Sequence, residues 1–389
     1  MHTLQHQWLL PEYLEDVLPA EALRIESIRR KLLDLLHVHG YQYVIPPMLE
    51  YMESLITGAG YDLDLATFKV VDQLTGRLMG VRADMTPQAA RIDAHLLNHQ
   101  GITRLCYAGS VLRTKPDGLA RTREPLQLGA ELYGHAGVES DIEIHRLLIK
   151  ALQTIGVEKI HLDFSHVNVF GSLVKSCGID PTLEQALYAA LQSKNQALVK
   201  QLASVLDFAT REALIALTTL NGNVQILQKA REILPKIAGI NDALTQLEQV
   251  DVALQALNVT MSFDLSELRG YHYHSGMVFT AYAQGYKGPL ALGGRYDEVG
   301  SAFGRARPAT GFSIDLRGLV TALSPATLPK VILAPLAGED NALLNYIETL
   351  RAAGHVVVQT LPNSVAQIQE LNCDRQLVKQ NGQWQLVSI

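Results

Sequence analysis

Polar side chains interrupt apolar runs at two places in the first third of the chain. Residues 82–87 read Arg-Ala-Asp-Met-Thr-Pro, so Asp84 and Thr86 place a carboxylate and a hydroxyl at the end of a strand-like run. Farther along, Gln127, Gly129 and Glu131 alternate with apolar residues and therefore share one face of a predicted strand. A solvated sheet face is the commoner explanation of such alternation. The other interpretation is a polar ligand site.

Two later segments combine rings, cations and glycines. Residues 269–276 read Arg-Gly-Tyr-His-Tyr-His-Ser-Gly, and a Tyr/His cluster beside Arg269 could bind a small anion or a ring. The alternative is a hydrogen-bonded aromatic turn. Residues 292–297 read Leu-Gly-Gly-Arg-Tyr-Asp, where paired glycines let a backbone approach closely. Neither segment identifies a ligand by itself.

Metal and cofactor chemistry has little support in the sequence. His95 and His99 lie four apart on a predicted helix, and His272 and His274 lie two apart, but neither pair has a third ligand nearby. We find no Walker loop, dinucleotide fingerprint or nucleophile elbow. We therefore expect no metal and no cofactor.

The composition is that of an ordinary globular protein. Its 389 residues are 48% hydrophobic and 19% charged, and the net charge of -6 is weak evidence against a nucleic-acid partner. The three cysteines are scattered, with no metal-ligand spacing. We see no long apolar run for a membrane span and no signal peptide at the N-terminus, so we expect a cytoplasmic protein with no membrane partner.

Hydrophobic periodicity and turn residues predict the elements that must position these side chains. The pattern predicts helices over 20–39 and 139–155. It predicts strands over 41–45, 68–72, 77–82, 103–113, 125–133, 260–266, 277–283, 288–293 and 309–315. The strands follow one another across hairpins and long insertions without regular alternation with helices. This order predicts an α+β fold on a largely antiparallel sheet with flanking helices.

Two regions stand apart from that pattern. Residues 181–258 are rich in Leu, Ala and Gln and predict a helical insertion. Residues 324–329 predict a linker, and beyond it strands at 331–336 and 355–361 flank a helix at 340–353. We therefore expect a main domain over 1–324 and a small C-terminal α/β domain over 325–389.

The polar segments occur in an order and spacing that resembles the catalytic domain of class II histidyl-tRNA synthetases over about residues 10–320. Residues 40–50 resemble motif 1, which forms dimers in that class. Residues 112–134 resemble motif 2 and its following strand, and 269–273 resemble the histidine loop. Residues 293–297 resemble the Gly-Gly-Arg-Tyr-Asp signature, and 310–312 begin motif 3.

The departures from the synthetase pattern fall on the ATP site. Motif 2 has Lys115 where an acid helps to hold ATP, and motif 3 has Gly318 where an arginine clamps the phosphates. Losing such a group typically costs 100-fold or more in rate. His272 and His274 also replace an Asp and a Tyr of the histidine loop, and the C-terminal unit is shorter than an anticodon-binding domain.

The amino-acid pocket of the family matches better. By resemblance, Asp84 and Thr86 would hold the ligand ammonium, Gln127 would contact the substrate, and Glu131 would bind the imidazole of histidine. The remaining positions that match this pocket are Arg113, Arg269, Tyr273 and Tyr296.

A histidine pocket without ATP chemistry resembles the regulatory subunits of ATP phosphoribosyltransferase. The resemblance implies a non-catalytic chain that forms homodimers and assembles with the short-form ATP phosphoribosyltransferase catalytic subunit. It would activate that subunit and mediate feedback inhibition by L-histidine in the first step of histidine biosynthesis. Two alternatives remain open here: an active histidyl-tRNA synthetase, and a non-enzymatic histidine-binding scaffold of the same superfamily.

Overall fold

The computed structural model describes residues 8–56, 60–116, 122–321, 323, 327–362 and 370–389. The chain divides into two compact units, Met1–Ser324 and Pro325–Ile389. Residues 324–326 of the expected linker and residues 117–121 of the segment that resembles motif 2 lie outside the described residues.

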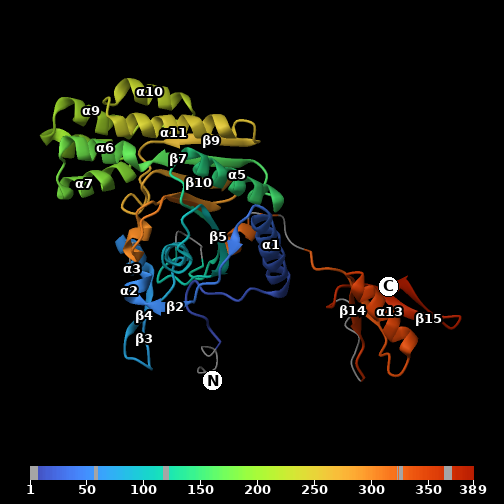
Figure 1. Ribbon diagram of the computed structural model, residues 1–389. Helices are drawn as coiled ribbons and strands as arrows, with labels where there is room; N and C mark the ends of the chain where they lie inside the picture. The colour runs from blue at the N-terminus through green and yellow to red at the C-terminus, as the bar shows by residue number, and fades with distance from the viewer. Residues whose placement is uncertain (1–7, 57–59, 117–121, 322, 324–326, 363–369) are drawn as a thin grey trace, which may run out of the picture. The chain divides into compact units, whose positions relative to one another are not determined.

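A nine-stranded sheet forms the centre of the larger unit (Figure 1), in the order β1-β5-β6-β12-β11-β10-β7-β9-β8. Neighbouring strands are antiparallel except β1 with β5 and β7 with β9. The predicted α+β class with a largely antiparallel sheet is confirmed. The strands are β1 (Gln42–Tyr43), β5 (Thr103–Ser110), β6 (Leu126–Tyr133), β7 (Ile160–His166), β8 (Asn221–Gly222), β9 (Val259–Asp264), β10 (Met277–Ala283), β11 (Ala291–Arg295) and β12 (Ala309–Asp315).

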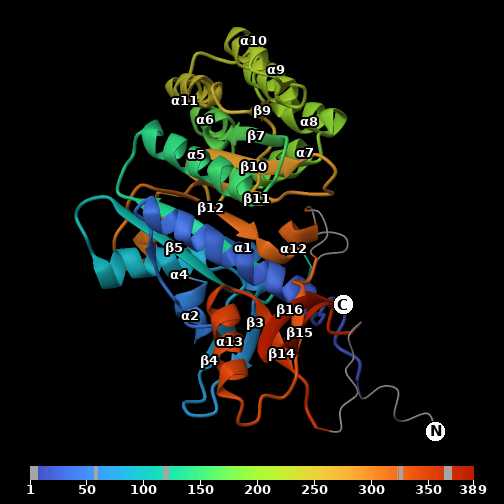
Figure 2. The same ribbon diagram turned by 90° about the vertical axis from the view of Figure 1, so that its right-hand side faces the viewer.

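Helices cover one face of this sheet and make the main core. In α1 (Pro19–Val38) the buried residues Ile25, Ile28, Leu32 and Leu36 recur at helical spacing, so one stripe of the helix faces inward. Figure 2 shows α1 lying alongside α5 and α12. The other helices that contribute to this core include α5 (Val138–Thr154), α6 (Val167–Cys177), α11 (Ala238–Leu254) and α12 (Leu316–Thr321).

The predicted helical insertion is present and begins after α6. Aspartate and asparagine side chains cap three of its helices: Asp180, Asn195 and Asp207 accept hydrogen bonds from the first-turn N–H groups. Only the two-residue β8 interrupts the described helices of this region. They are α7 (Pro181–Gln192), α8 (Gln196–Leu202), η2 (Ala203–Val205), α9 (Phe208–Leu217), α10 (Gln225–Ile233) and α11.

A three-stranded sheet, β2-β4-β3, precedes the first polar segment, and Asp84 of that segment contacts Gln127 on the face of β6 that points away from the main core. The strands predicted at 68–72 and 77–82 are present as β3 and β4, which pair antiparallel. This region contains β2 (Leu49–Tyr51), α2 (Met52–Leu55), α3 (Gly60–Ala66), β3 (Phe68–Val71), β4 (Leu78–Val81), α4 (Thr86–Arg91), the π-helix η1 (Ile92–Leu97) and, farther along the chain, η3 (Val299–Phe303).

The smaller unit has its own core and a four-stranded sheet in the order β14-β13-β15-β16. Its elements are β13 (Val331–Ala334), α13 (Asn341–Ala352), β14 (Val356–Gln359), β15 (Cys373–Gln380) and β16 (Gln383–Ser388). The last two strands form a hairpin that was not predicted from the sequence.

Candidate ligand pocket

A cavity of about 210 Å³ opens on the face of the large sheet that the core helices leave free. Its walls come from the end of the three-stranded sheet, from β6, from the loop before β10 and from the end of β11. Seven of the eight predicted pocket residues line it: Asp84, Thr86, Arg113, Glu131, Arg269, Tyr273 and Tyr296. Asp84 and Tyr296, which are 212 positions apart in the chain, therefore meet at one cavity.

Glu131 is the most deeply placed acid in this cavity. Its side chain is only 1% exposed, so the solvated sheet face considered from the sequence is the wrong interpretation of this strand. The Tyr107 hydroxyl donates to Oε1 at 2.8 Å, and the Tyr296 hydroxyl donates to Oε2. Burial raises the pKa of the Glu131 carboxyl to about 8, although both tyrosine hydrogen bonds act to lower it. Burial therefore outweighs the two hydrogen bonds in setting the pKa of this carboxyl.

Glycine makes room for this carboxyl. Gly311 of β12 pairs with Glu131 of β6 across the sheet. A β-carbon at position 311 would lie 1.7 Å from Oε2 of Glu131. On the other side, a β-carbon at Gly129 would lie 2.3 Å from the Tyr107 ring. The two glycines are thus the positions at which the sheet backbone admits the acid and its tyrosine partner.

Asp84 and Thr86 follow β4 and lie at the rim of the same cavity. Asp84 Oδ1 accepts from the Thr86 backbone N–H at 2.9 Å and from Gln127 Nε2 at 2.8 Å. The Thr86 hydroxyl lies 3.0 Å from the Tyr107 hydroxyl. Gln127 lines a smaller adjoining cavity of about 50 Å³, and its carbonyl oxygen accepts from the Met85 N–H. Gln127 therefore holds Asp84 in place without lining the larger cavity itself, whereas the family resemblance predicted that Gln127 contacts the ligand directly.

The loop at 269–276 has two sides. Tyr273 stacks on Tyr296 with ring centroids 5.4 Å apart, and the buried Tyr273 hydroxyl has no partner among the described residues. Tyr271 points the other way and donates to Glu184 of α7 at 2.8 Å. His272 also faces α7, at 3.3 Å from Gln185. Of the Tyr/His cluster, Tyr273 and His274 thus line the cavity, whereas Tyr271 and His272 face α7.

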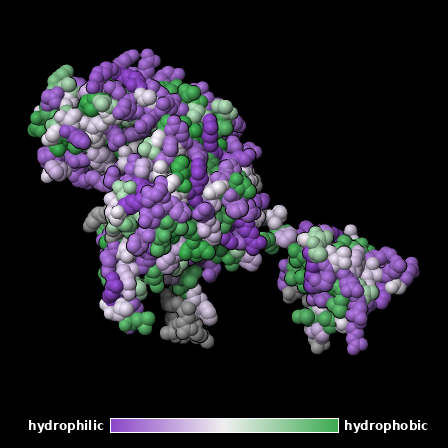
Figure 3. Space-filling view, in the orientation of Figure 1, coloured by the Kyte–Doolittle hydropathy of each residue, from purple (hydrophilic) through white to green (hydrophobic). Residues whose placement is uncertain are grey.

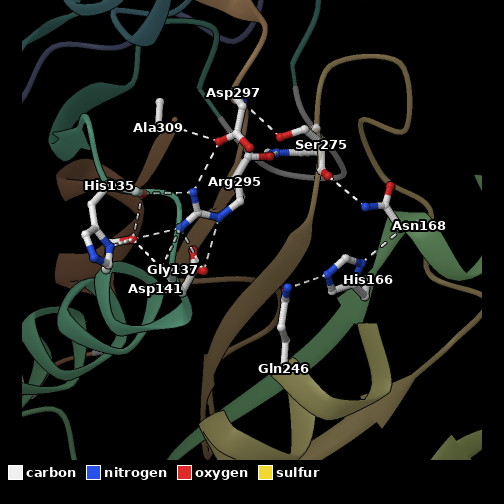
Figure 4. A network of polar contacts seen from close by, with 12 residues as sticks. His135, Gly137, Asp141, His166, Asn168, Gln246, Ser275, Arg295, Asp297 and Ala309 are labelled. Carbon is white, nitrogen blue, oxygen red and sulfur yellow. Dashed lines mark hydrogen bonds and ion pairs between the residues drawn. The ribbon is translucent and has the colours of Figure 1, made fainter. Parts of the chain in front are cut away.

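A buried polar network fastens this wall of the cavity to the core helices (Figure 4). Nε and Nη2 of Arg295 donate to Asp141 at 3.1 and 2.9 Å, and Nη1 donates to Asp297 at 3.2 Å. The Asp297 N–H donates to the Ser275 hydroxyl at 2.9 Å. Arg295 is therefore a structural residue, and its neighbour Tyr296 reaches the cavity from the opposite face of the chain.

Two positions, Lys115 and Gly318, depart from the ATP-site pattern of the synthetases. Lys115 is exposed, and a β-carbon at Gly318 would lie 3.0 Å from Asp315 Oδ2. The nearby Arg317 pairs with Glu124 at 3.3 Å.

Within the described part of the chain, no three His, Cys, Asp or Glu residues group as a metal site, and no helix is long and apolar enough to cross a membrane.

The sequence did not predict two residues that line the cavity, Asp163 and Glu267, or Tyr107, which contacts Glu131 and Thr86 beside it. Tyr107 lies in an apolar strand, where an aromatic residue is usually part of the core. Asp163 and Glu267 line the cavity, but they lie at a strand and a turn with no motif around them. Alternation within β7 puts Asp163 and Ser165 on one face, a signal that could have drawn attention to Asp163.

Fold and cavity together define a protein of the histidyl-tRNA synthetase class. The family model described as "Histidyl-tRNA synthetase" matches residues 13–319, and the model "ATP phosphoribosyltransferase subunit HisZ C-terminal domain" matches residues 329–387. A structure titled as an ATP phosphoribosyltransferase regulatory subunit/histidyl-tRNA synthetase from Bacillus halodurans superposes with a TM-score of 0.83. It is 27% identical and covers 94% of this chain and 96% of its own.

Two relatives of higher sequence identity are both ATP phosphoribosyltransferase regulatory subunits. The ATP phosphoribosyltransferase regulatory subunit of Methylobacillus flagellatus is 64% identical over 98% of both chains. The protein of the same name from Nitrosospira multiformis is 57% identical over 97% of this chain and 98% of its own. The chain belongs to the family of ATP phosphoribosyltransferase regulatory subunits. The prediction of a regulatory, non-catalytic subunit in histidine biosynthesis is confirmed by this membership.

Proposed function

We propose that this chain binds L-histidine in the cavity around Glu131. As a regulatory subunit it activates the short-form ATP phosphoribosyltransferase catalytic subunit and carries feedback inhibition to it. The observation that supports the ligand most directly is the buried Glu131 carboxyl between two tyrosine hydroxyls. A site that hydrogen-bonds an imidazole N–H discriminates strongly against ligands that lack that donor, because its polar groups are then left unpaired.

The other ends of histidine have complementary partners in the same cavity. The ligand ammonium would lie against Asp84 and Thr86, and the ligand carboxylate against Arg269, both in charge-assisted hydrogen bonds. The unpartnered Tyr273 hydroxyl would gain an acceptor or donor from the ligand. Arg113 lines both this cavity and the smaller adjoining one.

We also propose that the chain acts as a homodimer through the region of residues 40–50. The exposed apolar side chains here are Tyr43, Ile45, Met48 and Leu49. On the face shown in Figure 3, hydrophobic side chains are interspersed with hydrophilic ones over the lower part of the larger unit. Isologous contacts of this kind are the commonest form of oligomer. Light scattering at micromolar concentration should give the mass of a dimer, and a monomer would contradict the proposal.

The catalytic partner is tested by reconstitution. Mixed with a short-form catalytic subunit, the purified chain should raise its turnover by biasing its conformations, and histidine should lower that activity. Unchanged turnover would favour the histidine-binding scaffold. Incubation of the chain alone with histidine, ATP and pyrophosphate should give no histidine-dependent exchange. A clear exchange signal would favour a synthetase.

We place this function in the cytoplasm, in keeping with the composition. We further propose that residues 1–324 and 325–389 are separate domains. Limited proteolysis that yields two stable fragments would support this division, and cleavage scattered through both units would contradict it.

A further inference from the structure

The cation that would take the ligand carboxylate already has a carboxylate beside it. Arg269 Nη2 lies 3.5 Å from Glu267 Oε2, and both side chains line the cavity. The Arg269 backbone N–H also donates to Glu267 Oε1 at 2.9 Å. Arg269 is 47% exposed and Glu267 32%, so the pair is open to solvent and to an incoming ligand.

A second carboxylate, that of Asp163, lines the same cavity on the strand next to β10. Arg269 Nη1 contacts the Thr280 hydroxyl at 3.5 Å, and Thr280 of β10 pairs with Asp163 of β7. Paired residues on one sheet face have β-carbons about 4.5–5.5 Å apart. Asp163 lines the cavity as well, and burial followed by the nearby acids, Glu267 among them, raises the pKa of its carboxyl.

We propose that Glu267, supported by Asp163, competes with the ligand carboxylate for Arg269 and thereby sets a weakened affinity for histidine. This inference rests on the proposed function. When histidine binds, Arg269 must exchange Glu267 for the ligand carboxylate, and the acids also repel that carboxylate. The imidazole and ammonium ends are bound elsewhere, at Glu131 and at Asp84. The two acids therefore adjust affinity for the part of the ligand that distinguishes an amino acid from an amine.

Glu267→Gln removes the negative charge of this side chain and keeps its size and shape. Glutamine keeps an oxygen that can accept the Arg269 backbone N–H, so the loop retains its local hydrogen bond while the competing charge is removed. An exposed ion pair is typically worth little, and its loss should tighten histidine binding about two- to fivefold. Asp163→Asn keeps an acceptor for the Ser262 hydroxyl, which donates to Asp163 at 2.7 Å, and should change affinity in the same direction.

Calorimetry with two ligands provides the test, on the full chain. Histidine carries the carboxylate, whereas histamine has the imidazole and the ammonium without it. Glu267→Gln should tighten histidine binding and leave histamine binding unchanged. The matched control, Glu232→Gln on the exposed surface of α10, should change neither. The gain should shrink at high salt, because screening weakens an exposed pair.

The outcomes separate this inference from the function on which it rests. If wild type fails to bind histidine, the proposed function falls and the inference falls with it. If wild type binds histidine but Glu267→Gln binds it equally or more weakly, the inference alone is overturned. An equal change for histamine would also overturn it, since the effect would then not act through the carboxylate.

Discussion

Gly311 and Glu131 face each other across β12 and β6, and the carboxyl of Glu131 occupies the space that any side chain at position 311 would need. Gly311→Ala should therefore displace the carboxyl and abolish measurable histidine binding. The Ala130 carbonyl oxygen, 2.6 Å from the added carbon, should make the variant about 1–3 kcal/mol less stable through overpacking. Calorimetry and urea unfolding measure the two effects.

Gly101→Ala is the matched control for that experiment. A β-carbon at position 101 meets no atom within 4 Å, so both affinity and stability should stay at the wild-type level. A folded Gly311→Ala variant that binds histidine as wild type does would show that the ligand lies elsewhere.

Glu131→Gln should act in opposite directions on the bound and the empty protein. Histidine affinity should fall at least about tenfold, because a hydrogen bond to a charged group contributes roughly 1.5–3 kcal/mol. The empty protein should gain stability at high pH. The folded-state pKa of Glu131 is raised from 4.5 to about 8. Between these values the unfolded chain gives up a proton that the folded chain keeps, so wild type loses stability over this range and the loss is complete above about pH 8. Unfolding at pH 6 and pH 9 tests this; a pH response unchanged in the variant would count against it.

Tyr273→Phe probes the hydroxyl that has no partner in the described part of the empty protein. Removing it should leave the stability of the empty protein equal or higher, because a buried unpaired hydroxyl is unfavourable. Histidine affinity should fall by about two- to tenfold, the value of one neutral hydrogen bond. Affinity equal to wild type would show that this hydroxyl does not contact the ligand.

His145 predicts an acid-sensitive core. Its ring lies 4.4 Å from that of Phe279 and 5.0 Å from that of Phe164, and neither ring nitrogen has a partner among the described residues. Burial, with a smaller effect of Arg295, lowers the pKa of the imidazole to about 3. Below pH 6.5 the unfolded chain takes up a proton that the folded chain does not, so at pH 5 this residue should cost about 2 kcal/mol of stability.

His145→Leu should remove that share of the acid destabilisation. Urea unfolding at pH 5 and pH 8 should show a smaller difference in the variant than in wild type. A difference remains, because burial also lowers the pKa values of His166 and His274 to about 4. His99→Leu, at an exposed position, should leave the difference unchanged. An equal acid loss in His145→Leu and wild type would contradict the argument.

The sequence predicted the strands and their faces better than it predicted which side chains of neighbouring strands contact one another. Alternation placed Gln127 and Glu131 on one face, and the structure agrees. Alternation could not show that Tyr107 lies between Glu131 and Thr86, because the position of Tyr107 depends on the register of β5 against β6. The sequence is limited in the same way at Gly311. A glycine in a strand indicates that another group approaches its backbone closely, but only the pairing of β12 with β6 shows that this group is Glu131.

One missed element had a usable signal. Asn381 and Gly382 separate β15 from β16, and both have positive φ, as a two-residue hairpin turn requires. The π-helical turn at Ile92–Leu97 had none, because its apolar spacing resembles that of an ordinary helix.

The two tyrosine hydroxyls that donate to Glu131 also bear on how quickly a ligand leaves the pocket. Tyr107 and Tyr296 hold the carboxyl in the empty protein, so little binding free energy goes into immobilising that side chain. Differences in affinity among variants of one site arise mostly from dissociation rates. On the proposed function, residence time at this pocket then governs how soon the complex is released from inhibition after histidine is consumed. A charge that loosens the carboxylate end of the ligand, as Glu267 would, shortens that delay.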